Sequence, residues 1–384
     1  SLGVGWLHGY ERFISRLSID VAEVMRADGK AHIFSANAGT YSAPGINDTL
    51  QAINDGVMVK GWKYLTVSGE LDTYNAFGKL LSIDDRTGRT QTLTYDLPAA
   101  SGGDDDPNTL DTVTDDTGRQ LRFTYDASKR IATVTDPAGG VIAYGYDAVG
   151  NLFSVQYPDG RTKTYLYENP NFPHALTGII DENGTRYATY HYDAQGRAYE
   201  EEHAPNLDPT IDHHKLAYTT DTSGTPTSTT VTDPLGTSRT YNFTTILGVV
   251  KSTGQSQPGG SGCGPASSAT TYDANGKVAS RADFNGNKTC YAYDLTRNLE
   301  TARVEGLASG TACPADVAAY TPVANSAERK ILTEWHATFR LPTKVTEAGR
   351  ETSTIYDDHG NVTSLTIKDT ALNTIRTWST AYTY

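Results

Sequence analysis

The chain has 384 residues, a net charge of −13 and a sequence pI of about 5.1. This acidic balance argues against binding to nucleic acid, which needs Lys and Arg to neutralise phosphates, and against docking on anionic membranes. Counting Gly but not Tyr as apolar gives roughly 40 % apolar residues, below the ~45–50 % of globular domains. No stretch approaches the ~20 apolar residues of a membrane span. The composition favours a thin sheet with two large faces.

Residues 1–70 are less regular than the remainder of the chain. Trp6, Tyr10, Phe13 and Ile14 bring large apolar side chains close together in the sequence, which indicates an opening segment with its own packing. The first unit of a repeat array must cover an otherwise exposed edge. We therefore predict that residues 1–70 form the opening turns of the same sheet that continues through residues 71–384.

Residues 71–384 carry an aromatic–acidic pair that returns at a fixed interval. Close variants of the pair are Tyr74-Asn75, Tyr167-Glu168 and Trp335-His336. The steps from 74 to 95, 125 to 146, 146 to 167, 272 to 293 and 335 to 356 are all 21 residues, which indicates an array of repeats. The Tyr-Asp pairs themselves are Tyr95-Asp96, Tyr125-Asp126, Tyr146-Asp147, Tyr192-Asp193, Tyr272-Asp273, Tyr293-Asp294 and Tyr356-Asp357.

Glycines keep the same register and predict two turns in each repeat. An Asp placed three residues before a Gly can accept hydrogen bonds from its own downstream NH groups, and Gly accepts a positive φ. This is the chemistry of a short hairpin loop with a bulge. The glycines four residues after the aromatic are Gly78, Gly150, Gly196, Gly276 and Gly360, and those fourteen residues after it are Gly88, Gly139, Gly160, Gly286 and Gly349.

Between the turns, large and polar residues alternate. Leu121, Phe123 and Tyr125 stand two residues apart, so on a strand they share one face, while Thr, Lys and Arg take many of the alternate positions. Each repeat is therefore predicted to be two strands of about 7 residues with two turns. The fold class is all-β: a repeat array of antiparallel hairpins in one long sheet. Single hairpins are marginal, so stability should grow with neighbours.

The period is interrupted in four places, near residues 98–108, 200–232, 254–268 and 305–326. Inserts in repeat arrays usually fall in loops, and none of these ranges has the composition of an independent domain. We predict loop inserts in all four.

The whole pattern resembles the RHS/YD-repeat proteins, a family that includes bacterial polymorphic toxins and the related ectodomain region of teneurins. The resemblance is clearest from Tyr125 to Glu168. The stretch from Leu2 to Arg12 looks like the start of such arrays, and that from Trp335 to Pro342 looks like a recurrent aberrant repeat of bacterial members. The resemblance implies a sheet that spirals into a hollow cocoon around a C-terminal toxin, with export by type VI secretion or another route.

A separate core motif near the end of the family's shells carries aspartyl self-cleavage. The stretch Asp233-Pro234-Leu235-Gly236 is similar to part of that motif, but no Leu follows and the repeat explains all four residues. We therefore expect no self-cleavage at this site. The chain looks like part of a longer protein, because no toxin domain follows the array.

Four polar stretches are candidate sites, and each has a simpler explanation. Asp212-His213-His214 offers metal ligands, but adjacent residues on a strand point to opposite faces, so a solvated loop is the better interpretation. Glu200-Glu201-Glu202-His203 is interpreted as a charged surface run. Asp104-Asp105-Asp106 lacks the spacing of a calcium loop, and Ser261-Gly262-Cys263-Gly264 is interpreted as a flexible loop. We predict no catalytic residue, no cofactor site and no metal site.

The three cysteines lack the C-x-x-C spacing of a zinc site. Cys290 and Cys313 flank one irregular segment and can form a disulfide that leaves Cys263 over. Three separate free thiols are the alternative, and the sequence does not decide between them.

The predicted function is that of a structural shell segment that encapsulates and shields a linked C-terminal toxin or effector. It is not predicted to be an enzyme. The expected partners are the linked effector and a component of a secretion system, with neither nucleic acid nor membrane insertion, and the expected location is secreted or at the cell surface. The alternative is an extracellular adhesin or glycan-binding surface, which would need exposed rather than packed tyrosines.

Overall fold

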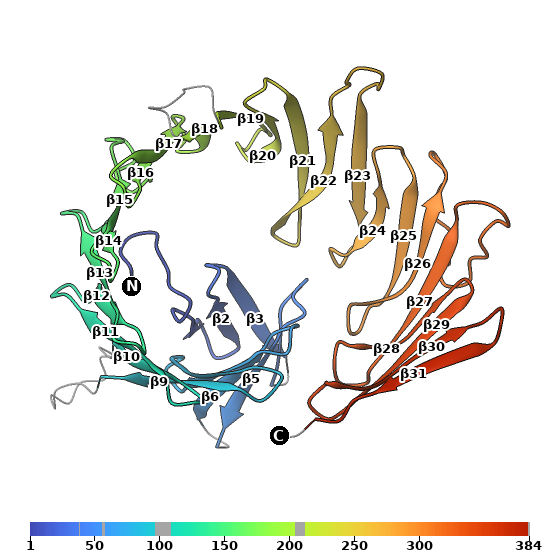
Figure 1. The fold of residues 1–384 in the computed structure, drawn as a ribbon, viewed down its shortest axis with the longest axis horizontal. Coiled ribbons are helices and arrows are strands. Elements are labelled where there is room, and N and C mark those ends of the chain that lie inside the picture. The colour runs from blue at the N-terminus through green and yellow to red at the C-terminus, as the bar shows by residue number, and fades with distance from the viewer. Residues whose placement is uncertain (38, 56–57, 97–108, 204–211, 383–384) are drawn as a thin grey trace. The chain divides into compact units, whose positions relative to one another are not determined.

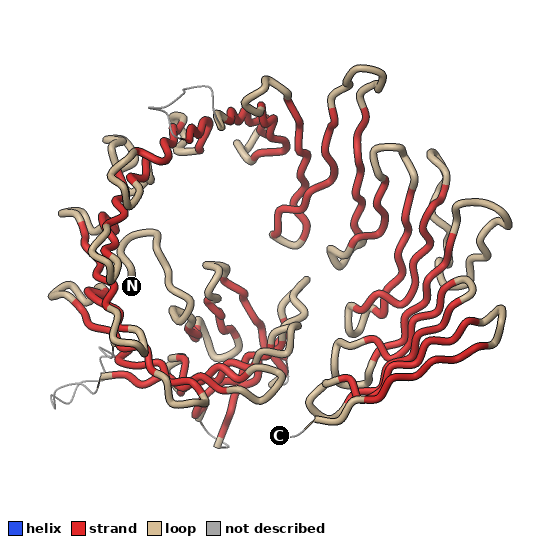
Figure 2. The backbone as a smooth tube through the Cα atoms, in the orientation of Figure 1, coloured by secondary structure: helices blue, strands red, loops and turns tan. Residues whose placement is uncertain are grey.

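The computed structural model describes residues 1–37, 39–55, 58–96, 109–203 and 212–382. Figure 2 shows only strands and loops in this part of the chain. The predicted insert at 98–108, with Asp104 to Asp106, lies outside the described residues. Among the described residues, no helix has the length and apolar character needed to span a membrane.

The chain divides into two compact units. Unit 1 comprises Ser1–Thr66, Glu70–Leu216 and Asp233–Leu235, and so takes in nearly all of the predicted opening segment together with the first repeats. Its strands, most of which are labelled in Figure 1, are β1 (Phe13–Arg16), β2 (Val21–Met25), β3 (Ala31–Asn37), β4 (Thr40–Ser42), β5 (Thr49–Asn54), β6 (Val59–Leu65), β7 (Leu71–Asn75), β8 (Leu80–Asp84), β9 (Thr90–Tyr95), β10 (Leu110–Asp115), β11 (Gln120–Tyr125), β12 (Ile131–Thr135), β13 (Val141–Tyr146), β14 (Leu152–Gln156), β15 (Thr162–Leu166), β16 (Gly178–Ile180), β17 (Arg186–Tyr192) and β18 (Ala198–His203).

Unit 2 comprises Val67–Gly69, Ala217–Thr232 and Gly236–Tyr384. The strand β19 (His214–Thr220) begins in unit 1 and ends in unit 2. The strands that follow are β20 (Pro226–Thr232), β21 (Ser238–Ile246), β22 (Val249–Gln257), β23 (Ala266–Tyr272), β24 (Val278–Ala282), β25 (Lys288–Asp294), β26 (Leu299–Leu307), β27 (Arg329–Trp335), β28 (Pro342–Glu347), β29 (Arg350–Tyr356), β30 (Val362–Asp369) and β31 (Thr374–Ser379).

Each described strand pairs with the next one along the chain, and the pairing is antiparallel. In the hairpin of β13 and β14, Tyr144 lies opposite Val155, and Tyr146 lies opposite Leu152 after a register shift. The same shift next to the repeat aromatic occurs between β11 and β12, β17 and β18, β23 and β24, and β29 and β30. The predicted fold class, an antiparallel hairpin array, is confirmed. The predicted bulge follows the first turn in these five repeats, whereas the hairpin of β15 and β16 has no register shift.

The hydrophobic core of unit 1 is built from alternate residues of its early strands. Trp62, Tyr64 and Tyr74 are almost completely buried, with Phe34 and Leu80 beside them. The opening segment supplies Ile14 from β1 to this core, whereas Phe13 is 38 % exposed. From β13 onward most strand residues are only partly buried on either face, which is the burial expected of a thin sheet.

The core of unit 2 is smaller and lies where an insert packs on the sheet. Cys290, Val304 and Leu307 are buried against Val317 from the segment that links β26 to β27. The insert predicted at 305–326 begins after Leu307. The insert predicted at 254–268 is shorter than predicted, because only the link between β22 and β23 lies outside the strands. The range 200–232 requires a larger correction, because β18, β19 and β20 occupy most of it. Thr220 takes the position directly before the turn where other repeats have Tyr, but Asp221 still forms the turn.

Candidate functional site

The repeated turn is held by one aspartate carboxylate. Oδ1 of Asp126 accepts hydrogen bonds from the NH groups of Ser128 and Arg130, both at 2.9 Å, and Oδ2 accepts one from Nε of Arg130 at 2.9 Å. The residue before Arg130, Lys129, has a φ of 59°, where most repeats place Gly. The two NH bonds to Oδ1 recur at Asp85, Asp115, Asp136, Asp147, Asp181, Asp193, Asp221, Asp273, Asp283 and Asp357.

Two predicted motif aspartates depart from this geometry. Asp294 accepts NH bonds from Thr296 and Arg297 instead, and its turn ends with Asn298 at a φ of 51°. Asp96 accepts a bond from the Thr109 hydroxyl at 2.9 Å across the 97–108 range. In the Asp233 turn, whose sequence resembles part of a cleavage motif, the NH of Leu235 donates to the Asp233 carboxylate, as in the other repeats.

The repeat tyrosine joins its own repeat to the preceding one. The Tyr167 hydroxyl donates to the carbonyl of Leu152 at 3.1 Å, and Leu152 is the residue that pairs with Tyr146. Tyr146 donates in turn to the Ile131 carbonyl at 2.7 Å, and Ile131 pairs with Tyr125. The same bond, to a carbonyl 15 residues earlier, is made by Tyr95, Tyr125 and Tyr293. Tyr192, Tyr272 and Tyr356 make it to Leu176, Ser252 and Pro342.

The basic residue that ends a turn strengthens this connection. Arg130, bound to Asp126, also lies over the ring of Tyr146 in the next repeat, 4.2 Å from its centroid. Such cation–π contacts contribute about 0.5–1 kcal/mol at exposed sites. Burial raises the pKa of Tyr125, Tyr146 and Tyr293 to about 12, so these hydroxyls remain donors well above neutral pH. The Tyr-Asp pair is therefore a joint between hairpins as well as a turn.

Replacing Tyr146 by Phe removes the hydroxyl and keeps the ring under Arg130. The Ile131 carbonyl then loses its donor, so we expect a loss of about 0.5–1.5 kcal/mol, measured as faster hydrogen exchange in β12 and β13. Tyr187→Phe is the matched control, because Tyr187 is 49 % exposed and lies outside the repeat series. Equal exchange in Tyr146→Phe and wild type would show that the bond contributes nothing.

The turn carboxylates make the array sensitive to acid. The pKa of Asp85 is lowered to about 2, and the largest cause is the hydrogen bond from the Thr87 hydroxyl. The NH groups of Arg89 and Thr87 lower it further. Burial alone would raise the pKa of Asp126, Asp147 and Asp193, but their turn hydrogen bonds together lower it.

Because these pKa values are lower in the folded chain than in the unfolded one, the stabilisation is complete above about pH 4 and is lost as the pH falls through the folded values. We expect the thermal unfolding midpoint to drop between pH 5 and pH 2, and Asp85→Asn to lessen the drop. A midpoint that stays constant over this range would contradict this account of the turn.

Residues 1–12, here called the N-terminal strap, lie along the tyrosine face of unit 1. This is the face that carries Phe123, Tyr125, Tyr146 and Tyr165. Ser1 accepts a bond from the Ile131 NH, Val4 donates one to the Gly150 carbonyl, and the Trp6 indole donates to the Tyr167 hydroxyl at 2.9 Å. The Trp6 ring lies 4.9 Å from that of Tyr165. The strap therefore contacts strands from three successive hairpins.

The opposite face of the sheet is polar and is joined by hydroxyl pairs. Thr94 and Thr112 are 2.5 Å apart through their Oγ1 atoms, and Thr124 and Thr133 are 2.6 Å apart. The pairs Thr230–Thr240 and Thr366–Thr377 continue this pattern in unit 2. Alternate positions therefore separate an aromatic face from a hydroxyl-rich face, as the sequence pattern predicts.

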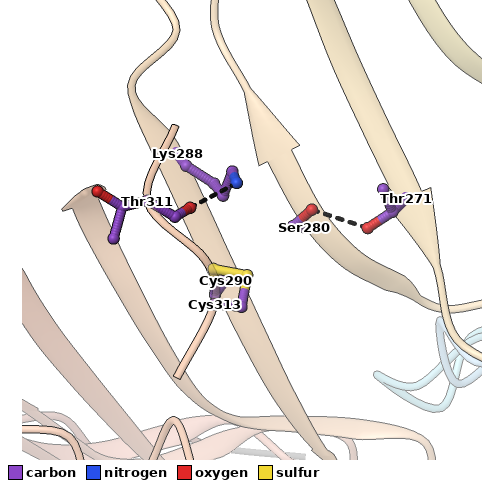
Figure 3. The surroundings of a disulfide bond; sticks show 6 residues. All are labelled: Thr271, Ser280, Lys288, Cys290, Thr311 and Cys313. Carbon is purple, nitrogen blue, oxygen red and sulfur yellow. Dashed lines mark hydrogen bonds between the residues drawn. A yellow bond between two sulfur atoms is a disulfide. The ribbon is translucent and has the colours of Figure 1, made fainter. Parts of the chain in front are cut away.

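The other predicted positions are placed as follows. Cys290 and Cys313 form a disulfide with Cα atoms 5.7 Å apart, and Cys263 is an exposed free thiol. Figure 3 shows Lys288 beside the disulfide, where it donates to the Thr311 carbonyl at 2.6 Å. The Ser261–Gly264 stretch is a turn closed between Gly260 and Cys263. Glu200, Glu202 and His213, which come from two separate sequence motifs, lie together on one face.

A continuous array of Asp-turned, Tyr-linked hairpins defines the class of repeat protein, and comparison with family models adds a match over part of the array. The RHS repeat family model matches residues 112–141 and 125–162. The matched residues include the repeats of Tyr125 and Tyr146, where the Tyr-Asp register resembles the RHS/YD-repeat family most clearly. Comparison with curated proteins finds no match.

Solved structures similar to this chain include toxin complexes. One is a TcdB2-TccC3-Cdc42 crystal structure, with 13 % identity and a TM-score of 0.33 over 94 % of this chain and 19 % of that chain. Another is the Photorhabdus luminescens Tc holotoxin pore, with 10 % identity and a TM-score of 0.32 over 91 % of this chain and 24 % of that chain. The chain therefore spans about a fifth of the length of these structures.

Proposed function

We propose that this chain is a wall segment of a shell that encloses and shields a linked C-terminal effector. The observation that carries the proposal is the uninterrupted pairing of each strand with the next from β1 to β31 among the described residues. Neighbouring strands in a sheet lie about 4.8 Å apart, which leaves no opening for a protein. Such a wall acts by mechanical exclusion and needs no catalytic group.

The burial and hydrogen bonds of the repeat tyrosines favour a wall over a glycan-binding surface. A surface that stacks on sugars needs rings and hydroxyls presented to solvent. Here the repeat hydroxyls of Tyr95, Tyr125, Tyr146, Tyr167 and Tyr293 are donated to backbone carbonyls of the preceding repeat, and their rings are partly buried. These groups hold the sheet together, so the tyrosines support the structural role.

The proposal includes export of the full-length protein. The Cys290–Cys313 disulfide supports it, because structural disulfides persist in oxidising compartments and are rare in the cytosol. The partners we propose are the linked effector and a component of a secretion system, and the role is delivery of a toxin in competition between bacteria. Detection of the intact protein in culture medium, with a cytosolic marker absent, tests the export.

Limited proteolysis of the full-length protein tests the shielding. We expect the segment downstream of the array to resist protease when joined to the shell and to be digested when produced alone. Unfolding the shell with denaturant at a concentration the isolated segment tolerates should remove the protection. Equal digestion of the joined and the isolated segment would overturn the proposal.

A further inference from the structure

Three neighbouring strands of unit 1 bring together a cluster of histidines and glutamates. In the ladder, His191 on β17 lies opposite Glu200 on β18, and Glu200 lies opposite Lys215 on β19. Opposed residues share a face, as do residues two apart on one strand. Glu202, and His213 just before β19, therefore join His191 and Glu200 on the polar face. Tyr190, Glu201 and His214 point to the other face.

Three side chains of this cluster, those of His191, Glu200 and Glu202, are within reach of one ion, and His213 lies beside two of them. The candidate ligand atoms of His191, Glu200 and Glu202 all lie within 4.8 Å of one another. Nε2 of His191 is 3.6 Å from Oε1 of Glu202, and Nε2 of His213 is 2.5 Å from Oε1 of Glu200 and 3.9 Å from Oε1 of Glu202. Ligands around tetrahedral zinc are about 3.3 Å apart when the bonds are about 2.0–2.1 Å, so small side-chain movements suffice.

The surroundings of the cluster suit a partly enclosed cation. The side chains of Glu200, Glu202 and His213 are 17 %, 23 % and 23 % exposed, and that of His191 is 40 % exposed. Two carboxylates balance the charge of a divalent ion. Lys215 lies 3.4 Å from Glu200 but is 61 % exposed, so its ammonium can turn to solvent when a metal enters.

We propose that His191, Glu200, Glu202 and His213 form a binding site for a divalent first-row transition metal such as zinc. Mixed imidazole and carboxylate ligands favour such ions over Ca²⁺ and Mg²⁺, which prefer oxygen ligands alone. Four protein ligands make a closed site, and closed sites are structural rather than catalytic. The ion would fasten three consecutive strands on the face that lacks the tyrosine links.

Metal titration of the chain, purified without a polyhistidine tag and stripped with a chelator, tests the site. We expect one zinc ion per chain by equilibrium dialysis, a higher unfolding midpoint with zinc because the ion binds the folded chain, and no competition from Mg²⁺. His191→Ala and Glu202→Gln should each weaken zinc binding at least about tenfold. Co²⁺ bound in place of zinc should show the intense visible absorption of tetrahedral coordination, and zinc should displace it.

The opposite face supplies the matched control. His214 and Glu201 form a similar pair, 3.7 Å apart, so His214→Ala and Glu201→Gln should leave the tight binding unchanged. Circular dichroism of every variant checks that the sheet is intact. The proposal is overturned if the wild-type chain binds no zinc, if the control variants lose binding as fully as the cluster variants, or if Co²⁺ keeps the weak spectrum of the hydrated ion.

Discussion

Arg12→Ala is expected to destabilise unit 1 by about 3–5 kcal/mol, because it leaves a buried carboxylate without its partner. Nη1 of Arg12 lies 3.0 Å from both oxygens of Asp72, whose side chain is 2 % exposed, and 2.6 Å from Oε1 of Glu70. The Tyr74 hydroxyl donates to Asp72 at 3.0 Å but carries no charge. Denaturant unfolding followed by Trp fluorescence, with hydrogen exchange in β1 and β7, measures the loss.

The loss should depend on pH. Burial raises the pKa of Asp72, and the charge and hydrogen bonds of Arg12 partly offset this effect. The folded pKa of Asp72 is already above the unfolded value and rises further without Arg12, so the cost of the substitution is smallest in acid and grows as the pH rises above about 4. The double variant Arg12→Ala with Asp72→Asn should recover part of the stability.

Arg161→Ala is the matched control for Arg12. Arg161 pairs with Asp159, but their side chains are 64 % and 58 % exposed, and such surface pairs contribute about 0–1 kcal/mol. If Arg12→Ala costs no more than Arg161→Ala, the buried pair does not hold the opening segment to β7.

The parts of the fold that repeat were predictable, because period and turn chemistry act within one repeat. Asp126 and the NH groups it binds lie within five residues of each other, and the alternation of Phe123 and Tyr125 sets a face within one strand. These rules are local, so the Tyr-Asp register is enough to predict hairpin after hairpin. They also explain why residues 200–232 form strands instead of the predicted loop insert. The turn at Asp221 keeps the local rule, although Thr220 stands where other repeats have Tyr.

The contacts that join repeats could not be predicted from the sequence pattern. The Tyr146 hydroxyl binds a backbone carbonyl, which leaves no signal in residue type, and its reach depends on a bulge in the neighbouring hairpin. Arg12 and Asp72 lie 60 positions apart, outside any period. His213 and His214 point to opposite faces, as predicted, but the partners of His213, Glu200 and Glu202, come from β18, in a register that only the ladder reveals.

Cys313→Ala is expected to cost about 2–4 kcal/mol locally, since a cross-link limits the unfolded chain. The bond joins β25 to the insert between β26 and β27 across a sequence separation of 23, and it holds Val317 against Val304 and Leu307 in the unit 2 core. Cys290, which is 1 % exposed, remains buried as a small apolar side chain, so the effect reports the lost cross-link.

Proteolysis and hydrogen exchange in residues 308–328 should both accelerate, and reduction of the wild-type chain should reproduce the change. Cys263→Ser, at an exposed free thiol, should alter neither. An insert that stays equally protected in Cys313→Ala would mean that apolar packing alone holds it to the sheet.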